Sequence, residues 1–422
     1  MIAQSFQNRG HRASRAETFD SWRTRMDRVR IAPVIAVAGS RGKTSVVRAV
    51  ESIFREAGYR VASWTDQGVD IEGKSQRGEI GPWARALTSL SAGGLDVAIQ
   101  ELDWATVATL GASLKRFPVI AITNLCANNE SCLISPEMLR ARRSLDRLRA
   151  NSLQSARLIL NADDYAVVKE NELESAERFL VGMNPDSPLL RHHVDNEGAA
   201  CWIDGSAIVL YQNQQSKPVI DLRWLKWTRN GSIPFAVQTA LLATAIARGC
   251  GLPLELIASG LVAHEPKPEM MPGAFNMFRL GSSQIVVDRP MPPWFLKRTL
   301  RAAASLATGR QIHVTGPMYE IDTHELFAIG RLLGRGGSVM IIHGNWTDDR
   351  LGLIRRGAAA NTVPPIVLQA VSERSAIEQG IGMLRSGDVL LVLAEDAVAA
   401  VRVVARRVRR QTSLNQPAAG AA

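Results

Sequence analysis

Residues 34–45 read Val-Ile-Ala-Val-Ala-Gly-Ser-Arg-Gly-Lys-Thr-Ser, an apolar run that leads directly into a loop with two glycines, a lysine and a threonine. Val34–Ala38 has the length and composition of a buried strand, and Val46–Ala57 repeats apolar residues at helical spacing. Glycines let the backbone curl until several N–H groups converge, and a helix N-terminus adds its positive dipole end. The stretch therefore predicts a strand, a phosphate-binding loop and a helix that begins near Ser45.

The polar residues of this loop predict the chemistry of a nucleoside triphosphate site. Lys43 would place its ammonium on the β- and γ-phosphates, and Thr44 its hydroxyl on Mg²⁺. We expect ATP and Mg²⁺ to be bound by Gly39, Ser40, Arg41, Gly42, Lys43, Thr44 and Ser45. The alternative is a glycine-rich turn with an incidental lysine, and the order glycine, lysine, threonine between a strand and a helix argues against it.

Beyond the loop, short apolar runs alternate with helical stretches, which predicts α/β architecture with parallel sheets in two successive domains. We expect strands at 34–38, 96–100, 119–123, 157–160, 207–211, 284–287, 311–315, 338–342, 365–368 and 388–393. Three prolines and a glycine interrupt the pattern within residues 264–274 and suit a linker. The expected organisation is a basic extension (1–30), a phosphate-loop domain (31–265), a smaller α/β domain (266–410) and a disordered tail (411–422).

Composition narrows the class of protein. The chain has 422 residues, 46% of them hydrophobic, and a formal net charge of +10. No apolar run approaches the ~20 residues of a membrane-spanning helix, and residues 1–30 lack the apolar stretch of a signal peptide. The basic residues come without zinc-finger spacing or an aromatic RNA-binding signature, so we expect no nucleic-acid partner. Cys126, Cys132, Cys201 and Cys250 lack metal-ligand spacing, which predicts unbridged thiols in a reducing compartment.

One departure within the loop points to a particular family. The general phosphate-loop pattern places its first glycine five residues before Gly42, where this chain has Val37. The short form Ala-Gly-Ser-Arg-Gly-Lys-Thr-Ser resembles the loop of the Mur ligase superfamily, whose members join amino acids to peptidoglycan precursors, folates or polyglutamate. The arginine in the loop and the following Thr-Ser-Val-Val-Arg resemble the poly-γ-glutamate synthase ligase branch. The resemblance implies a Mur-ligase-like central domain followed by a smaller C-terminal domain.

Later segments resemble the same family in the same order. Asp96–Glu101 resembles the strand that ends in a Mg²⁺-binding glutamate, which implies a metal role for Glu101. The strand that ends in Thr-Asn is matched by 119–124, and further motifs by 161–164, 272–274 and 387–391. Thr65 falls where a further metal or phosphate contact lies, although a threonine in a polar turn also bonds its own backbone. Asp288 falls where the C-terminal domain approaches the ribose; the alternative is a solvent-facing aspartate at a strand end.

The resemblance implies an ATP-dependent, ADP-forming ligation of a carboxylate to an amine through an acyl phosphate. Lys43 and Glu101 are its expected catalytic residues, and Thr44, Glu101 and Thr65 its expected metal ligands. The implied substrate is an acidic amino acid or peptide, with glutamate or poly-γ-glutamate as candidates. The implied location is the cytoplasm, or the membrane periphery through membrane-associated partner subunits.

Several positions depart from the family pattern. Asn128 and Asn129 stand where the family has Asp-His, and Arg142 and Arg143 lie near the place of a carbamylated lysine. The paired asparagines that contact adenine are absent before the alanine-rich helix at 235–249. The second hypothesis is therefore a nucleotide-binding protein without ligase activity, which acts as a regulatory ATPase or an assembly subunit.

A third hypothesis concerns the C-terminal segment. Ala397, Val401, Val404 and Val408 recur at helical spacing, and Arg402, Arg406, Arg407, Arg409 and Arg410 occupy other positions. A basic amphipathic helix of this kind suits a membrane surface or a partner complex. The alternative is an ordinary terminal helix that packs its valines on the sheet.

Overall fold

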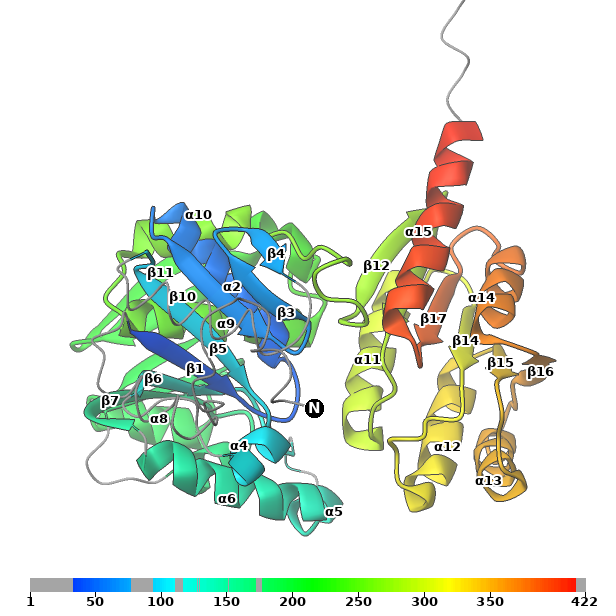
Figure 1. The fold of residues 1–422 in the computed structure, drawn as a ribbon, viewed down its shortest axis with the longest axis horizontal. Helices are drawn as coiled ribbons and strands as arrows, with labels where there is room; N and C mark the ends of the chain where they lie inside the picture. The colour runs from blue at the N-terminus through cyan, green and yellow to red at the C-terminus, as the bar shows by residue number, and fades with distance from the viewer. Residues whose placement is uncertain are drawn as a thin grey trace, which may run out of the picture. The chain divides into compact units, whose positions relative to one another are not determined.

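The computed structural model describes residues 33–76, 94–110, 117–126, 128, 130–150, 152–171 and 177–414. The chain divides into two compact units, of which unit 1 ends at Glu265 and unit 2 begins at Pro266. Each unit is a sheet with helices on both faces (Figure 1). The expected α/β class is therefore confirmed.

In the described part of unit 1, eleven strands form one sheet in the order β11-β10-β9-β8-β7-β6-β1-β5-β2-β3-β4. The strands are β1 (Val34–Ala38), β2 (Val61–Thr65), β3 (Gly68–Ile71), β4 (Lys74–Gln76), β5 (Val97–Leu102), β6 (Phe117–Ile122), β7 (Ser152–Asn161), β8 (Glu177–Gly182), β9 (Ala199–Asp204), β10 (Ala207–Gln212) and β11 (Gln215–Asp221). From β9 to β2 all neighbours are parallel, whereas β3, β4, β10 and β11 continue the sheet antiparallel at its two ends. These antiparallel ends are not foreseen in the sequence.

Helices cover both faces of this sheet (Figure 1). One face carries α2 (Lys43–Glu56), α9 (Pro234–Gly249) and α10 (Leu254–Ala263). The other carries α4 (Trp104–Leu110), α6 (Pro136–Ala150), α7 (Tyr165–Lys169) and α8 (Pro188–Asp195), with the short α5 (Glu130–Leu133) before α6. The 3₁₀ turns η1 (Leu222–Trp224) and η2 (Lys226–Thr228) lead into α9.

The apolar run Val34–Ala38, which forms β1, is the centre of this arrangement. Along β1, Val34, Ala36 and Ala38 pack into one core and Ile35 and Val37 into the other. A strand buried on both faces must be apolar throughout, because successive side chains point to opposite sides. The position of β1 between β5 and β6 brings the ends of all three strands to one edge.

Unit 2 has a six-stranded sheet in the order β12-β13-β17-β14-β15-β16. The strands are β12 (Asn276–Leu280), β13 (Ser283–Asp288), β14 (Gln311–Thr315), β15 (Val339–His343), β16 (Ile366–Ala370) and β17 (Val389–Leu393). Only β12 is antiparallel to its neighbour. The helices α14 (Glu373–Gly382) and α15 (Ala397–Leu414) pack on one face. The remaining helices are α11 (Pro293–Leu306), α12 (Leu326–Gly336) and α13 (Asp348–Ala359), with the turn η3 (Thr323–Glu325).

Two expectations need correction. Helix α15 runs to Leu414 and so includes the first residues of the expected disordered tail, because helical packing on the sheet extends through Val408. Cys126 and Cys132 form a disulfide with a Cα–Cα distance of 5.7 Å, whereas Cys201 and Cys250 are free. The spacing of the two cysteines does not reveal this pairing, because it depends on the turn of the intervening loop, in which Asn128 has a φ of 63°. In the described parts of the chain, no helix is long and apolar enough to cross a membrane.

A buried histidine in β14 makes the stability of unit 2 depend on pH. His313 is fully buried, and burial lowers its pKa to about 4 from the ordinary 6.5. Between these values the unfolded chain takes up a proton that the folded chain refuses, so stability is lost as the pH falls from 6.5 towards 4. At about 1.4 kcal/mol per pKa unit, the loss is on the order of 3 kcal/mol.

We expect urea unfolding at pH 7 and pH 5 to show that the free energy of unfolding falls less between these pH values in His313→Asn than in the native protein. The asparagine amide can donate to the Leu333 carbonyl as Nδ1 does in the native protein. The exposed His324→Gln, also in unit 2, serves as the control and should keep the native pH dependence. An unchanged pH dependence in His313→Asn would refute this assignment.

Candidate nucleotide site

The loop between β1 and α2 is shaped by two glycines with positive φ. Gly39 has φ of 143° and Gly42 has φ of 81°, values that residues with a side chain rarely adopt. Gly42 is the N-cap residue of α2, which begins at Lys43 rather than near Ser45, and no side chain caps this helix end. The first N–H groups of α2 and its positive dipole end therefore remain available to an anion.

The loop is held in place by the end of β6. Asn124 binds it three times: its carbonyl accepts from Ser40 N–H (2.9 Å), its Oδ1 accepts from Arg41 N–H (3.1 Å), and its Nδ2 donates to the Arg41 carbonyl (2.8 Å). The Thr123 hydroxyl also donates to the Arg41 carbonyl (2.6 Å). Gly39 packs so closely that a Cβ there would lie 2.0 Å from Thr123 Oγ1. The Thr-Asn pair after β6 is thus the clamp of the loop, a role that the motif alone did not reveal.

Lys43, Thr44 and Glu101 meet beside the start of α2. The Thr44 hydroxyl donates to Glu101 Oε2 (2.8 Å), and Lys43 Nζ lies 3.6 Å from Glu101 Oε1. The Lys43 side chain is 13% exposed and that of Glu101 8%. Residues predicted from two separate motifs therefore form one cluster, because β5 lies next to β1 in the sheet.

Glu101 carries its charge in a costly environment. Burial raises its pKa, and the nearby Asp66 carboxylate raises it further, while Lys43, the Thr44 hydroxyl and the Asp66 N–H oppose these effects. A buried carboxylate that is not fully compensated is well placed to gain from a cation. Asp66, which lies in the turn between β2 and β3, is a second carboxylate here that the sequence analysis missed.

These residues fit a magnesium site of the kind found beside nucleotide phosphates. No group of three or more His, Cys, Asp or Glu side chains in the described chain is arranged to hold a metal. Mg²⁺ beside phosphates needs fewer protein ligands, since phosphate oxygens and water complete its shell. The oxygens of Thr44 and Glu101 would hold it, and the bound cation would neutralise phosphate charge.

The remaining predicted residues have different surroundings. The Thr65 hydroxyl accepts from Gln67 N–H (3.2 Å) within its own turn, next to Asp66. Arg41 and Ser45 are both partly exposed. Asp288 ends β13 in unit 2, where it is only 7% exposed and accepts from Arg289 N–H (2.8 Å). Asp288 is therefore buried, contrary to the solvent-facing alternative.

The departures from the family pattern have structural explanations. Asn128 accepts from Tyr165 N–H (2.7 Å) and donates to the Asp163 carbonyl (3.0 Å), so its amide ties two loops together. Arg142 forms an ion pair with Glu170 (2.9 Å). Asn129 lies outside the described residues.

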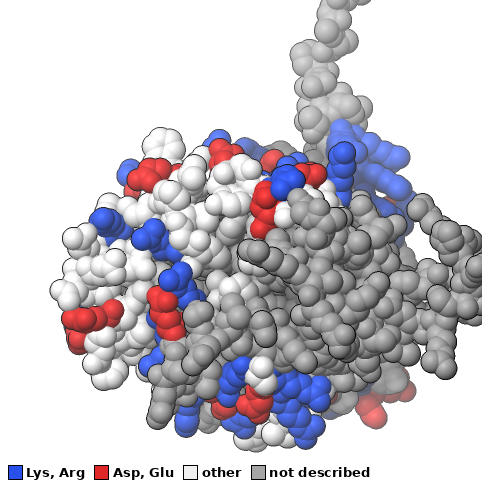
Figure 2. Space-filling view, turned by 60° about the vertical axis from the view of Figure 1, so that its left-hand side comes forward, with Lys and Arg blue, Asp and Glu red and all other residues white. Residues whose placement is uncertain are grey.

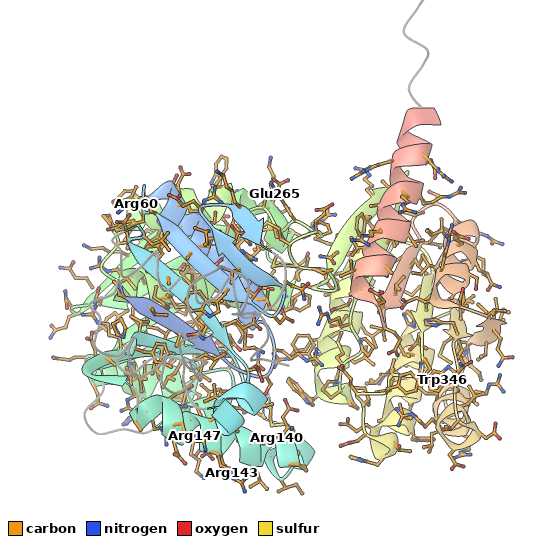
Figure 3. The ribbon with its side chains drawn as sticks, in the orientation of Figure 1. Arg60, Arg140, Arg143, Arg147, Glu265 and Trp346 are labelled. Atoms are coloured by element: carbon orange, nitrogen blue, oxygen red, sulfur yellow. A yellow bond between two sulfur atoms is a disulfide. The ribbon has the colours of Figure 1, made fainter. Side chains whose placement is uncertain are left out.

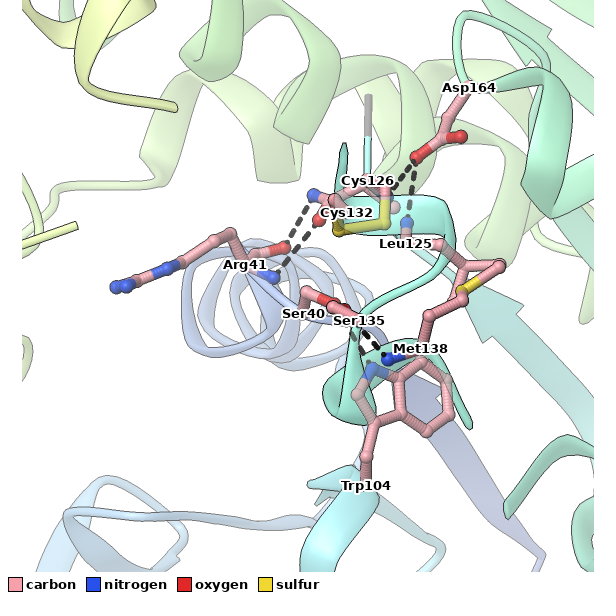
Figure 4. Close-up of a disulfide and its surroundings, with 10 residues drawn as sticks. Ser40, Arg41, Trp104, Leu125, Cys126, Cys132, Ser135, Met138 and Asp164 are labelled. Carbon is pink, nitrogen blue, oxygen red and sulfur yellow. Dashed lines mark hydrogen bonds between the residues drawn. A yellow bond between two sulfur atoms is a disulfide. The ribbon is translucent and has the colours of Figure 1, made fainter. Parts of the chain in front are cut away.

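The disulfide lies beside the phosphate loop (Figure 4). Cys126 lies two residues after Asn124 of the clamp, and Asp164 accepts from the N–H groups of Leu125 (2.7 Å) and Cys126 (2.9 Å). On the other side, Trp104 Nε1 donates to Ser40 Oγ (3.2 Å). The Arg41 side chain points away from the disulfide (Figure 4). Trp104 and Asp164 are supports of the loop that sequence reasoning did not identify.

A second cluster of polar side chains lies at the carboxyl ends of β14, β15 and β17 in unit 2. His343 Nε2 lies 3.9 Å from Glu373 Oε1, and Glu395 accepts from Met318 N–H. Burial lowers the pKa of His343 to about 4, and burial raises the pKa of Glu373 and of Glu395. The imidazole is thus neutral near pH 7 and does not compensate the carboxylates. Ligands of open α/β sheets bind at this strand edge.

Basic side chains form two surfaces, one on α6 and one on α15. Arg140, Arg143 and Arg147 lie on the side of α6 that faces away from the sheet (Figure 3). Arginine side chains also gather along α15 (Figure 2). Val401 and Val404 of α15 are buried against the sheet, as the ordinary terminal helix requires. Membrane-associated partners therefore stay a prediction.

The fold and the loop place the chain among the α/β proteins with a phosphate-binding loop. In sequence it is 23% identical to a cyanophycin synthetase of Trichormus variabilis over 387 residues, covering 89% of this chain and 42% of that protein. It is 25% identical to the UDP-N-acetylmuramoyl-L-alanyl-D-glutamate–2,6-diaminopimelate ligase of Mesorhizobium japonicum, covering 85% of this chain and 72% of that protein. The chain thus spans less than half the length of the cyanophycin synthetases it matches. No protein-family model matches.

Solved structures give the same picture of the fold. E. coli FolC in complex with ADP superposes with a TM-score of 0.62 at 17% identity, covering 93% of this chain and 94% of that one. A pseudomurein peptide ligase type C from Methanothermus fervidus also gives 0.62 at 17% identity, covering 89% and 79%. In sequence and fold the chain is thus similar to ligases of the Mur type, which is the resemblance that the loop predicts. The polyglutamate branch stays a prediction.

The close approach at Gly39 gives a direct test of the loop. We expect Gly39→Ala to weaken ATP binding at least about tenfold, or ~1.4 kcal/mol, because its Cβ would displace Thr123 from the Arg41 carbonyl. Isothermal titration calorimetry measures the change. The control is Gly205→Ala, which also replaces a glycine of positive φ (57°) but has no atom within 4 Å of the new Cβ. Equal ATP affinity in both variants would contradict the clamp.

Proposed function

We propose that this chain is an ATP-dependent ligase that joins a carboxylate to an amine through an acyl phosphate and releases ADP. The observation that carries the proposal is the cluster of Lys43, Thr44 and Glu101 at the uncapped N-terminus of α2. The likeness to Mur-type ligases and cyanophycin synthetases supports the reaction class. The non-ligase hypothesis rests only on the departures of the sequence from the family pattern.

In the proposed reaction a substrate carboxylate oxygen attacks the γ-phosphorus of ATP, and the bond to the bridging oxygen breaks to release ADP. The amine nitrogen then attacks the acyl carbon; the carbon–oxygen bond to phosphate breaks, phosphate leaves, and the nitrogen loses a proton. The first step needs positioning and charge neutralisation more than covalent help. Lys43 and the first N–H groups of α2 supply positive charge and hydrogen bonds for the transferring phosphoryl group.

We infer that the carboxylate substrate is an acidic amino acid or peptide. Glutamate and poly-γ-glutamate are the candidates that the resemblance of the loop implies. A net charge of +10 favours anionic substrates of this kind. One relative is named for a reaction on a D-glutamate-containing precursor.

The decisive experiment is ATP turnover by the purified chain with Mg²⁺ and a panel of acidic amino acids, with ADP and AMP followed separately. We expect ADP release stimulated by the substrate, and a hydroxamate when hydroxylamine replaces the amine. Lys43→Ala should lower turnover at least about 100-fold, the scale of a lost phosphate-stabilising group. Arg55→Ala removes an exposed cation from the far end of α2 and should leave turnover unchanged.

Each other outcome has a defined meaning. Release of AMP and pyrophosphate would exclude the acyl phosphate. Binding of ATP without stimulated turnover under the whole panel would support the regulatory hypothesis. Turnover that survives Lys43→Ala would remove the proposed role of the cluster.

We further propose that Glu373 and Glu395 in unit 2 attract the ammonium group of the amine substrate before it loses its proton. The support is their position at the carboxyl ends of the strands and the nearby His343, which is neutral near pH 7 and does not offset their charge. Glu373→Gln keeps an oxygen that accepts from Glu395 N–H (2.7 Å in the native protein) but removes the charge.

Glu373→Gln should therefore raise the KM for the amine several-fold with little change in kcat, as expected when ground-state binding is lost. Steady-state kinetics with varied amine test this. Glu378→Gln, an exposed change on the same helix, is the control. An unaltered KM in Glu373→Gln would contradict the assignment.

A further inference from the structure

The strand β16 ends the sheet of unit 2 and has one open edge. It pairs with β15, and Ile366 N–H donates to the Ser338 carbonyl (3.1 Å). Figure 1 shows β16 at the margin of its unit. Backbone groups of successive residues point to opposite edges of a strand. Since Ile366 bonds to β15, the N–H and C=O groups of Val367 and Gln369 point to the open edge.

This edge is also unusually apolar. Four exposed large hydrophobic residues of the described chain fall within residues 363–371: Val363 (79%), Ile366 (63%), Val367 (36%) and Val371 (95%). Between residues 361 and 372 the sequence has no charged residue and no histidine. Natural edge strands are usually protected by lysine, proline or inward-pointing charge, because an open edge is a template for pairing. Here Pro364 and Pro365 precede the strand, and the strand itself contains no lysine, no proline and no charged residue.

We propose that two copies of this chain associate through this edge, with β16 pairing antiparallel with β16 of the second copy around a two-fold axis. A two-fold axis at Leu368 places Val367 of each copy opposite Gln369 of the other. Both residues direct their backbone groups outward, so each pair exchanges two hydrogen bonds and the contact has four. Such an isologous contact closes on itself and gives a dimer rather than a fibre.

The charge of the chain favours a second copy at this place. A net charge of +10 makes two copies repel each other over most of their surface. The uncharged segment 361–372 is where they can approach without like charges meeting. The same register places the exposed Ile366 beside Ala370 of the second copy and removes its side chain from water.

Sedimentation velocity of the full chain over a range of concentrations tests the proposal. We expect a dimer that dissociates on dilution. Val367→Pro should raise the dissociation constant at least tenfold, because it removes an outward N–H that β15 does not use. Circular dichroism and thermal unfolding verify that the variant is folded.

Two double variants test the register. Val367→Lys with Gln369→Lys places lysines opposite each other and should give a monomer, whereas Val367→Lys with Gln369→Glu places opposite charges together and should keep the dimer. Leu256→Lys with Val262→Lys adds two charges at exposed positions of unit 1 and should leave the dimer unchanged. A wild-type chain that stays monomeric at every concentration, or double variants at 367 and 369 that behave alike, would overturn the proposal.

Discussion

The whole candidate site depends on the close approach of Gly39 to the end of β6. Without a Cβ at this residue, the backbone can come near enough for Thr123 and Asn124 to hold the Arg41 carbonyl and two loop N–H groups. The curl of the loop then leaves the N-terminus of α2 uncapped and open to an anion. A larger residue at position 39 would lose the approach and the positive φ together.

The order of strands turns this loop into a site. Because β5 lies beside β1, Glu101 reaches Thr44 and Lys43, and because β2 lies beside β5, the turn with Asp66 comes against Glu101. A buried carboxylate, a hydroxyl and an ammonium then share a small space. Burial makes the incompletely compensated charge of Glu101 costly, and this is the physical reason why we expect a cation to bind at this point.

The parts of the fold that the sequence predicts are those whose signal is local. Buried central strands such as β1 and β17 are apolar along their whole length, so their positions follow from the sequence within a residue or two. The antiparallel strands β4 and β11 at the two sheet ends are more polar and were not predicted, whereas the apolar β10 was. The loop residues and Glu101 could be named as a nucleotide site, but the supports Trp104 and Asp164 could not, since each acts across a sequence gap of 38 residues or more.

By itself the sequence determined the α/β class, the phosphate loop and the resemblance to Mur-type ligases, because glycine conformation, strand burial and helix periodicity are properties of short segments. The tertiary structure decided the rest. It showed that Asn128 ties loops together, that Cys126 and Cys132 are joined, that Asp288 is buried and that the apolar strand β16 has an open edge. These features depend on which distant segments become neighbours, and local sequence carries no record of that.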